Sequence, residues 1–230
     1  AILHLLYSRF FIKSINSYYK EIDFKEPFKN LFTQGMVCHE TYKDDKNNWV
    51  SPEEIETING KKYLKSNKSK EITVGPSESM SKSKKNTVDP LDIVAEFGAD
   101  TLRMYEMFMG PLEQVKPWQT NGCKGIRSFL NKAWRLFVND DGSNREFKEG
   151  KDDKKVLQAL HAAIKESTQG IEALKFNTPV SKMMEFVNAC KNTRPTKDAA
   201  EKFAIILAPY APHIAEELWE RFGHSEGITF

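Results

Sequence analysis

The sequence has few cysteines, no long apolar run and almost no net charge, and each shortage excludes a class of protein. The three cysteines are odd in number and far apart, which argues against a disulfide framework and for reduced thiols: Cys38, Cys123 and Cys190. No apolar run is long enough to span a bilayer, and residues 1–11 have neither the basic start nor the cleavage site of a signal peptide. We therefore expect a cytoplasmic protein with no membrane partner.

Metal-binding and repeat patterns are also missing. Cys38 and His39 could form half of a metal site, but no second Cys/His pair stands at ligand spacing, so we expect no metal site. No segment recurs at a fixed period. The chain starts without methionine, and its first residues have the pattern of a helix interior, so we expect a fragment of a longer protein.

The N-terminal third has the pattern of mixed structure. With 40% hydrophobic and 11% aromatic residues among 230, the chain has enough apolar side chains to bury a core. Residues 2–19 carry apolar groups at a helical period. Residues 66–86 are polar and small, which predicts a mobile loop. Short strands are predicted before this loop, the last two joined by Asn59-Gly60 as a type I′ turn: 36–37, 49–50, 55–58 and 62–64.

From Asp89 onward the pattern is almost wholly helical. Asp89 is a favourable N-cap, Pro90 fits the first helical position, and Gly98 ends the helix. Apolar stripes at helical spacing follow, each opposite a charged face: 100–109, 126–137, 156–174, 183–190, 203–207 and 214–222. We predict a mixed fold class, in which an α/β part is followed by an all-α helical bundle.

Positive charge is concentrated in one tract. Residues 61–85 contain eight lysines and two glutamates, a net charge of +6 in a chain whose total is +2. Such a tract is a candidate site for phosphates, and it is equally compatible with a solvated loop. Lysines and hydroxyls just before a capped helix suit a triphosphate, because they supply positive charge and hydrogen bonds.

The surrounding segments resemble a known family. Residues 79–86 (SMSKSKKN) resemble the K-M-S-K-S loop of class I aminoacyl-tRNA synthetases, and residues 97–103 (FGADTLR) resemble the G-A-D-x-x-R segment after it. Residues 112–122, with Trp118, resemble the L-E-W-x-x-x-G stretch, although Lys116-Pro117 stands where an acidic residue is usual. Further segments are similar to the leucyl branch: 1–10, 34–37 (QGMV), 48–52 (NWVSP), 176–179, 184–188 and 207–219.

The resemblance implies an organisation and a reaction. Residues 1–86 would be the second half of a Rossmann-type catalytic domain, 87–122 a stem-contact helical segment, and 123–230 an anticodon-binding bundle. Such enzymes activate leucine with ATP, accompanied by Mg²⁺, to leucyl-adenylate and transfer leucine to tRNA(Leu), and a monomer is expected. The H-I-G-H motif, leucine pocket and editing domain are absent from this chain. We therefore expect the chain alone to be inactive.

Site residues follow from the same resemblance. Lys82 matches the second lysine of the motif and is implied as the catalytic contact to the triphosphate. Met36 and Val37 match the strand that borders the adenine, and an ordinary core strand is the alternative reading. The residues implied in ATP binding are Met36, Val37, Met80, Ser81, Lys82 and Ser83.

One departure and two alternatives remain open. Ser79 replaces the first lysine of the motif, and either Lys84 or Lys85 could supply the missing charge. A valyl, isoleucyl or methionyl enzyme is an alternative, which the segment around Trp49 argues against. A non-catalytic tRNA-binding module is the alternative outside the enzymes. For Trp118, Trp134 and Trp219, core packing is favoured over stacking on RNA bases.

Overall fold

The computed structural model describes residues 2–19 and 24–229. Ala1 and Phe230, the outermost residues of the first and last expected domains, lie outside the described residues. The chain forms two compact units, residues 1–34 and 35–230, and each is described by itself. None of the helices in the described ranges is both long and apolar enough to cross a membrane.

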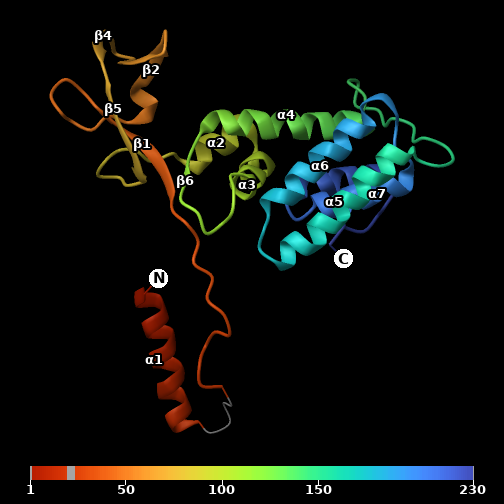
Figure 1. The fold of residues 1–230 in the computed structure, drawn as a ribbon, viewed down its shortest axis with the longest axis horizontal. Helices are drawn as coiled ribbons and strands as arrows, with labels where there is room; N and C mark the ends of the chain where they lie inside the picture. Colours follow the sequence, from red (N-terminus) through yellow and green to blue (C-terminus); the bar gives the residue numbers. More distant parts are fainter. Residues whose placement is uncertain (1, 20–23, 230) are drawn as a thin grey trace. The chain divides into compact units, whose positions relative to one another are not determined.

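The first unit consists of helix α1 (Ile2–Tyr18) and the irregular segment after it, and it confirms the helix predicted here (Figure 1). No residue of α1 is buried, so its apolar side chains lie open within this chain. Arg9 donates two hydrogen bonds to Glu26, Nε to Oε2 at 2.8 Å and Nη2 to Oε1 at 3.0 Å. This bidentate pair fastens the irregular segment to the helix.

The second unit starts with a three-stranded sheet of order β5-β1-β6. The central strand β1 (Val37–Lys43) pairs antiparallel with β5 (Thr73–Ser79) and parallel with β6 (Lys116–Pro117). The register opposes Cys38 to Ser79 and Val37 to Lys116. Three segments far apart in the sequence therefore meet at β1.

A second small sheet has the order β2-β3-β4, from Ile55–Ile58, Lys61–Leu64 and Asn67–Glu71. Asn59 and Gly60 have φ angles of 49° and 81°, the left-handed pair that the predicted type I′ turn requires. Between β1 and β2 lies a short 3₁₀ turn, Pro52–Glu54. A small apolar cluster lies beneath this sheet: Tyr42, Val50 and Ile72, with Ile55 and Leu64 packed against it.

The loop predicted over residues 66–86 is wrong for most of its length, because β4 and β5 lie within it. Both strands expose most of their side chains, so they lack the apolar alternation that marks a half-buried strand. Pro76 is tolerated because β5 is an edge strand and its register with β1 shifts between Glu40 and Tyr42, where the ladder is irregular. Its carbonyl instead accepts a hydrogen bond from Thr41 Oγ1 at 3.1 Å.

Apart from β6 and the connecting loops, helices make up the rest of the unit, as predicted. The side chain of Asp89 accepts a hydrogen bond from Leu91 N at 2.8 Å and caps α2, and Gly98 (φ 88°) turns the chain into α3. The helices run α2 Pro90–Phe97, α3 Ala99–Phe108, α4 Thr120–Phe137, α5 Lys154–Glu172, α6 Asn177–Ala189, α7 Lys197–Leu207 and α8 Pro212–Arg221. A 3₁₀ turn, Cys190–Asn192, follows α6.

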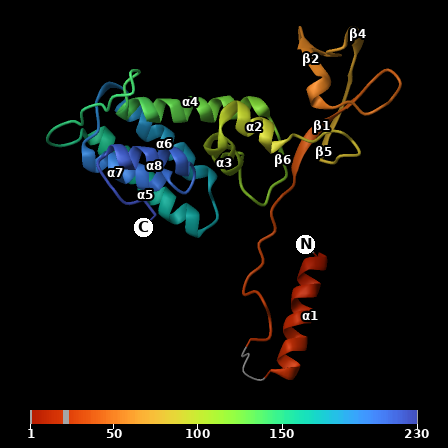
Figure 2. The same ribbon diagram turned by 180° about the vertical axis from the view of Figure 1, so that it is seen from behind.

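A single apolar core runs through these helices. It extends from Ile93 in α2 to Phe222 after α8, with Phe186 and Phe203 stacked at its centre, 4.9 Å between ring centroids. Figures 1 and 2 show α5, α6 and α7 close together in this part of the chain, and Figure 2 labels α8 among them. Trp118 is buried against Tyr105, as core packing predicts. Core burial therefore joins the segment after the loop to the bundle.

Gly35 allows β1 to start close to the segment before β6. Its N–H donates to Leu112 O at 2.7 Å, and a Cβ at this position would overlap the backbone carbonyl of Gln114. We predict that Gly35→Ala lowers the free energy of unfolding by about 1–3 kcal/mol, because the backbone must move. Gly125→Ala in α4 meets nothing within 4 Å and is expected to raise it by about 0.5–1 kcal/mol. Urea unfolding of the two variants checks the opposite signs.

Candidate functional site

The pairing of β1 with β5 places the predicted ATP-binding segments side by side. Cys38 lies opposite Ser79, so Met36 and Val37 lie beside the point where the chain leaves β5 at Met80. Met36 is 58% exposed and Val37 is 40% exposed, so neither belongs to the core of this chain. The signature loop, defined here as residues 80–86, therefore starts next to an accessible strand end.

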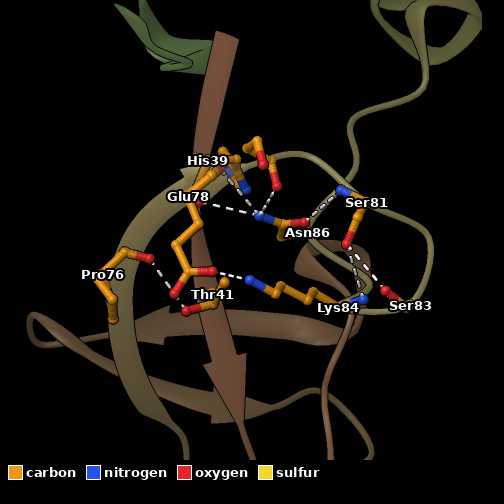
Figure 3. A network of polar contacts seen from close by, with 9 residues as sticks. His39, Thr41, Pro76, Glu78, Ser81, Ser83, Lys84 and Asn86 are labelled. Carbon is orange, nitrogen blue, oxygen red and sulfur yellow. Dashed lines mark hydrogen bonds and ion pairs between the residues drawn. The ribbon is translucent and has the colours of Figure 1, made fainter. Parts of the chain in front are cut away.

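Asn86 holds the neck of the signature loop (Figure 3). Its side chain is fully buried, and its Oδ1 accepts a hydrogen bond from Ser81 N at 2.9 Å. Its Nδ2 lies 3.2 Å from His39 O, 3.3 Å from Glu78 O and 3.5 Å from Ser79 O. One amide thus ties both ends of the loop to β1 and β5.

The inside of the loop is a tight turn with an exposed tip. Ser81 Oγ lies 3.2 Å from Ser83 Oγ and accepts a hydrogen bond from Lys84 N at 3.3 Å. Lys85 N donates to Lys82 O, and Lys85 has a left-handed φ of 53°. Lys82 and Ser83 are exposed, whereas the side chain of Met80 packs against the main core.

Most lysines of the basic tract are neutralised by acidic neighbours. Lys84 pairs with Glu78 across the neck of the loop. Four more pairs follow: Lys61–Glu71, Lys62–Glu40, Lys68–Glu56 and Lys70–Asp45. Within the described ranges, Lys65, Lys82 and Lys85 have no carboxylate within 4.0 Å, and two of these three belong to the loop. The tract as a whole is therefore less positive than its sequence indicates, and the loop keeps its charge.

A polar hollow of about 420 Å³ is lined in part by His39, Glu40 and Lys62. Burial lowers the pKa of His39, and the hydrogen bond from Lys62 Nζ, 2.6 Å long, lowers the pKa of Glu40. Tyr42 OH also donates to Glu40 Oε2 at 2.8 Å. These contacts join β3 to β1, so the second sheet is fixed to the strand that carries His39.

A basic face runs along α4. Lys124, Arg127, Lys132 and Arg135 are all exposed, and with Ser128 and Asn131 they line a hollow of about 300 Å³ that contains no acidic side chain among the described residues. Sequence reasoning missed these four residues. Their signal was the spacing of three to five residues opposite the apolar stripe of α4, which places them on one helix face.

Two family models match the chain. Residues 72–116 match the model for tRNA synthetases class I (I, L, M and V), and residues 153–230 match the anticodon-binding domain of tRNA ligase. The first match contains the whole signature loop, and the second contains α5 to α8.

Curated relatives are more specific than the family models, because they are leucine–tRNA ligases. The chain is 42% identical to leucine–tRNA ligase 1 of Rhizobium johnstonii over 100% of its own length and 27% of the relative's. It is 41% identical to leucine–tRNA ligase of Borrelia hermsii, over 99% of the chain and 26% of the relative. The chain is similar to one segment of these leucine–tRNA ligases. It spans about a quarter of the length of these relatives.

A solved structure of such a ligase is similar as well. The structure of the leucyl-tRNA synthetase of Agrobacterium radiobacter K84, a ternary complex with tRNA and LeuAMS, matches with a TM-score of 0.66 and 27% identity. The match covers 98% of this chain and 27% of that one. The predicted fold class is confirmed: a mixed α/β part with small sheets precedes a helical bundle.

The chain offers no dedicated metal ligands in the part that the structure describes. No group of three or more His, Cys, Asp or Glu side chains there could hold a metal ion. Near the loop, the Glu78 carboxylate is already occupied by Lys84. Residues of this chain therefore do not fit a protein-bound Mg²⁺ at the loop.

The neck of the loop can be tested in the chain itself. Asn86→Ala leaves Ser81 N and the carbonyls that Asn86 contacts without their partner, so we predict a loss of about 1–3 kcal/mol in the free energy of unfolding. Hydrogen exchange at the Ser81 amide should also become faster. Asn188→Ala, at an exposed position of α6, should change stability by less than about 0.5 kcal/mol. Equal small effects in both variants would contradict the role given to Asn86.

Proposed function

We propose that this chain supplies the signature loop and the tRNA-binding bundle of a leucine–tRNA ligase. The enzyme would activate leucine with ATP to leucyl-adenylate and transfer leucine to tRNA(Leu). One observation carries the proposal: Asn86 fixes the neck of a loop whose tip presents Lys82, beside the accessible strand end at Met36. Residues 1–86 would be the second half of the catalytic domain, 87–122 the stem-contact segment, and 123–230 the anticodon-binding bundle.

Lys82 is the residue proposed to act on the triphosphate. Its ammonium group is exposed and, among the described residues, free of a carboxylate partner, so it can approach phosphate oxygens as pyrophosphate leaves. Ser81 and Ser83 supply hydroxyl groups 3.2 Å apart, and Met80 anchors the loop in the core. Met36 and Val37 would border the adenine. Mg²⁺ would come with ATP, and we assign it no ligand in this chain.

The missing first lysine of the motif is better replaced by Lys85 than by Lys84. Ser79 brings no charge to its position. Lys84 is held by Glu78 at the neck of the loop, so its charge is already compensated. Lys85 is exposed, and its left-handed backbone conformation ends the turn inside the loop. Charge stabilisation by Lys82, with Lys85 beside it, is therefore the chemistry that this loop offers.

The basic face of α4 is the proposed contact for the tRNA backbone. Lys124, Lys132 and Arg135 project from one helix face, and among the described residues no acidic side chain lines its hollow. Outside the hollow, Arg135 Nε lies 3.8 Å from Asp140 Oδ1 in an exposed ion pair. Such a face binds phosphates without reading sequence.

We place the protein in the cytoplasm as a monomer. Its free cysteines fit a reducing compartment, and burial raises the pKa of the Cys123 thiol to about 11 and that of Cys190 to about 12.

Lys82 and Lys84 are separated by one residue, which makes them a matched pair. In the full-length synthetase that carries this segment, Lys82→Ala is expected to lower leucine-dependent pyrophosphate exchange by roughly 100-fold, because a transition-state contact is lost. Lys84→Ala removes only a partly exposed ion pair and should cost less than about tenfold. Equal losses would refute the assignment of Lys82. An unmutated full-length protein without exchange would favour a non-catalytic tRNA-binding module.

The α4 face is tested by salt dependence of tRNA binding to the chain. Replacing Lys124, Lys132 and Arg135 by alanine should weaken binding and reduce the slope of log K against log salt by about three. Arg127 is left in place because its guanidinium donates to Phe97 O. The control removes three lysines that are already paired: Lys61, Lys68 and Lys70. A larger effect in the control would indicate that the basic tract, and not the α4 face, is the RNA-binding surface.

A further inference from the structure

Asp100 and Arg103 of α3 connect the segment after the signature loop to α8 and to the turn before it. Asp100 Oδ1 accepts a hydrogen bond from His213 N at 3.2 Å and lies 2.8 Å from His213 Nδ1. Its Oδ2 accepts from Ile214 N at 2.8 Å, and the Asp100 side chain is only 12% exposed. Arg103 Nη2 donates to Pro209 O at 3.2 Å. Both contacts join residues more than a hundred positions apart in the sequence.

Asp100 acts as an N-cap for a helix to which it does not belong. Helix α8 has Ala211 at its own N-cap position, with no side-chain hydrogen bond, and Pro212 in the first turn has no N–H. The orphan N–H groups of the next two residues are taken by the Asp100 carboxylate. The negative charge also lies at the positive end of the helix dipole. The start of α8 is therefore built from α3.

The segment from the signature loop to Asp100 is short, and hydrogen bonds fix it at the loop and at the corner between α2 and α3. Asn86 fixes the loop, and α2 starts four residues later at Pro90. At the corner between α2 and α3, Arg127 Nη1 of α4 donates to Phe97 O at 3.1 Å. Gly98 forms this corner with its left-handed φ of 88°. Displacement of α8 would therefore be transmitted to α3 and toward the loop.

We propose that Asp100 and Arg103 are positioning residues for the charging of tRNA, which set where the tRNA-binding bundle lies relative to the signature loop. This inference rests on the proposed function. Both residues belong to the segment 97–103, whose resemblance to a family motif left their role open. Their side chains are directed at α8 and at the turn before it. They act through the bundle and not through ATP.

The test separates the two steps of the reaction in the full-length synthetase. Asp100→Asn has nearly the same shape but directs an amide N–H₂ at a backbone N–H, and Arg103→Gln removes the bond to Pro209. In both variants, leucine-dependent pyrophosphate exchange should stay within about twofold, because the loop is intact. The kcat for tRNA charging should fall roughly tenfold or more, because small misplacement of a bound substrate is costly. The KM for tRNA should change little, since the α4 face is untouched.

Asp198→Asn is the matched control. Asp198 is an exposed acid in the first turn of α7, a helix that is capped by its own Thr196, so both steps should be unchanged. Equal losses in exchange and charging, or unchanged charging in both variants, would overturn the positioning role. If Asp100→Asn does not fold, the exposed Arg103→Gln decides by the same criteria. A wild-type enzyme without leucine-dependent exchange would instead contradict the proposed function.

Discussion

A buried amide must find hydrogen-bond partners, and this requirement on Asn86 organises the candidate site. Its oxygen and nitrogen can be satisfied only if β1, the end of β5 and the start of the loop meet around it. The same arrangement leaves the side chain of Lys82, at the tip of the loop, without a carboxylate partner among the described residues. Lys82 is consequently exposed for a structural reason, and its charge is available to a ligand.

The helices after the loop are attached to one another through a shared apolar core. One core spans α2 to α8, so the segment after the loop and the bundle fold around the same apolar side chains. At the surface of that core, polar contacts decide the relative placement of helices, as the Asp100 carboxylate shows at α8. The signature loop and the basic face of α4 are thus parts of one packed unit, residues 35–230.

Local signals in the sequence were sufficient where local chemistry fixes the structure. Asp89-Pro90 and Gly98 set the limits of α2, and Asn59-Gly60 set a hairpin, because each depends on its own backbone preferences. The strands in 66–86 were missed because their mostly exposed side chains show no apolar alternation, and backbone pairing with β3 and β1 forms them. The motif drew attention to the loop and included Asn86, but its partner His39 lies 47 residues away. Such distant pairings leave no periodic trace.

The three cysteines give the molecule internal reporters of its own opening. Each is free and buried, and they lie in different places: Cys38 in β1, Cys123 in α4 and Cys190 directly after α6. Alkylating reagents attack thiolates, and burial opposes both their access and, for Cys123 and Cys190, the ionisation itself. The labelling rate of each thiol therefore records how often its own element separates from its neighbours. Strand and bundle can thus be followed independently without introducing a probe.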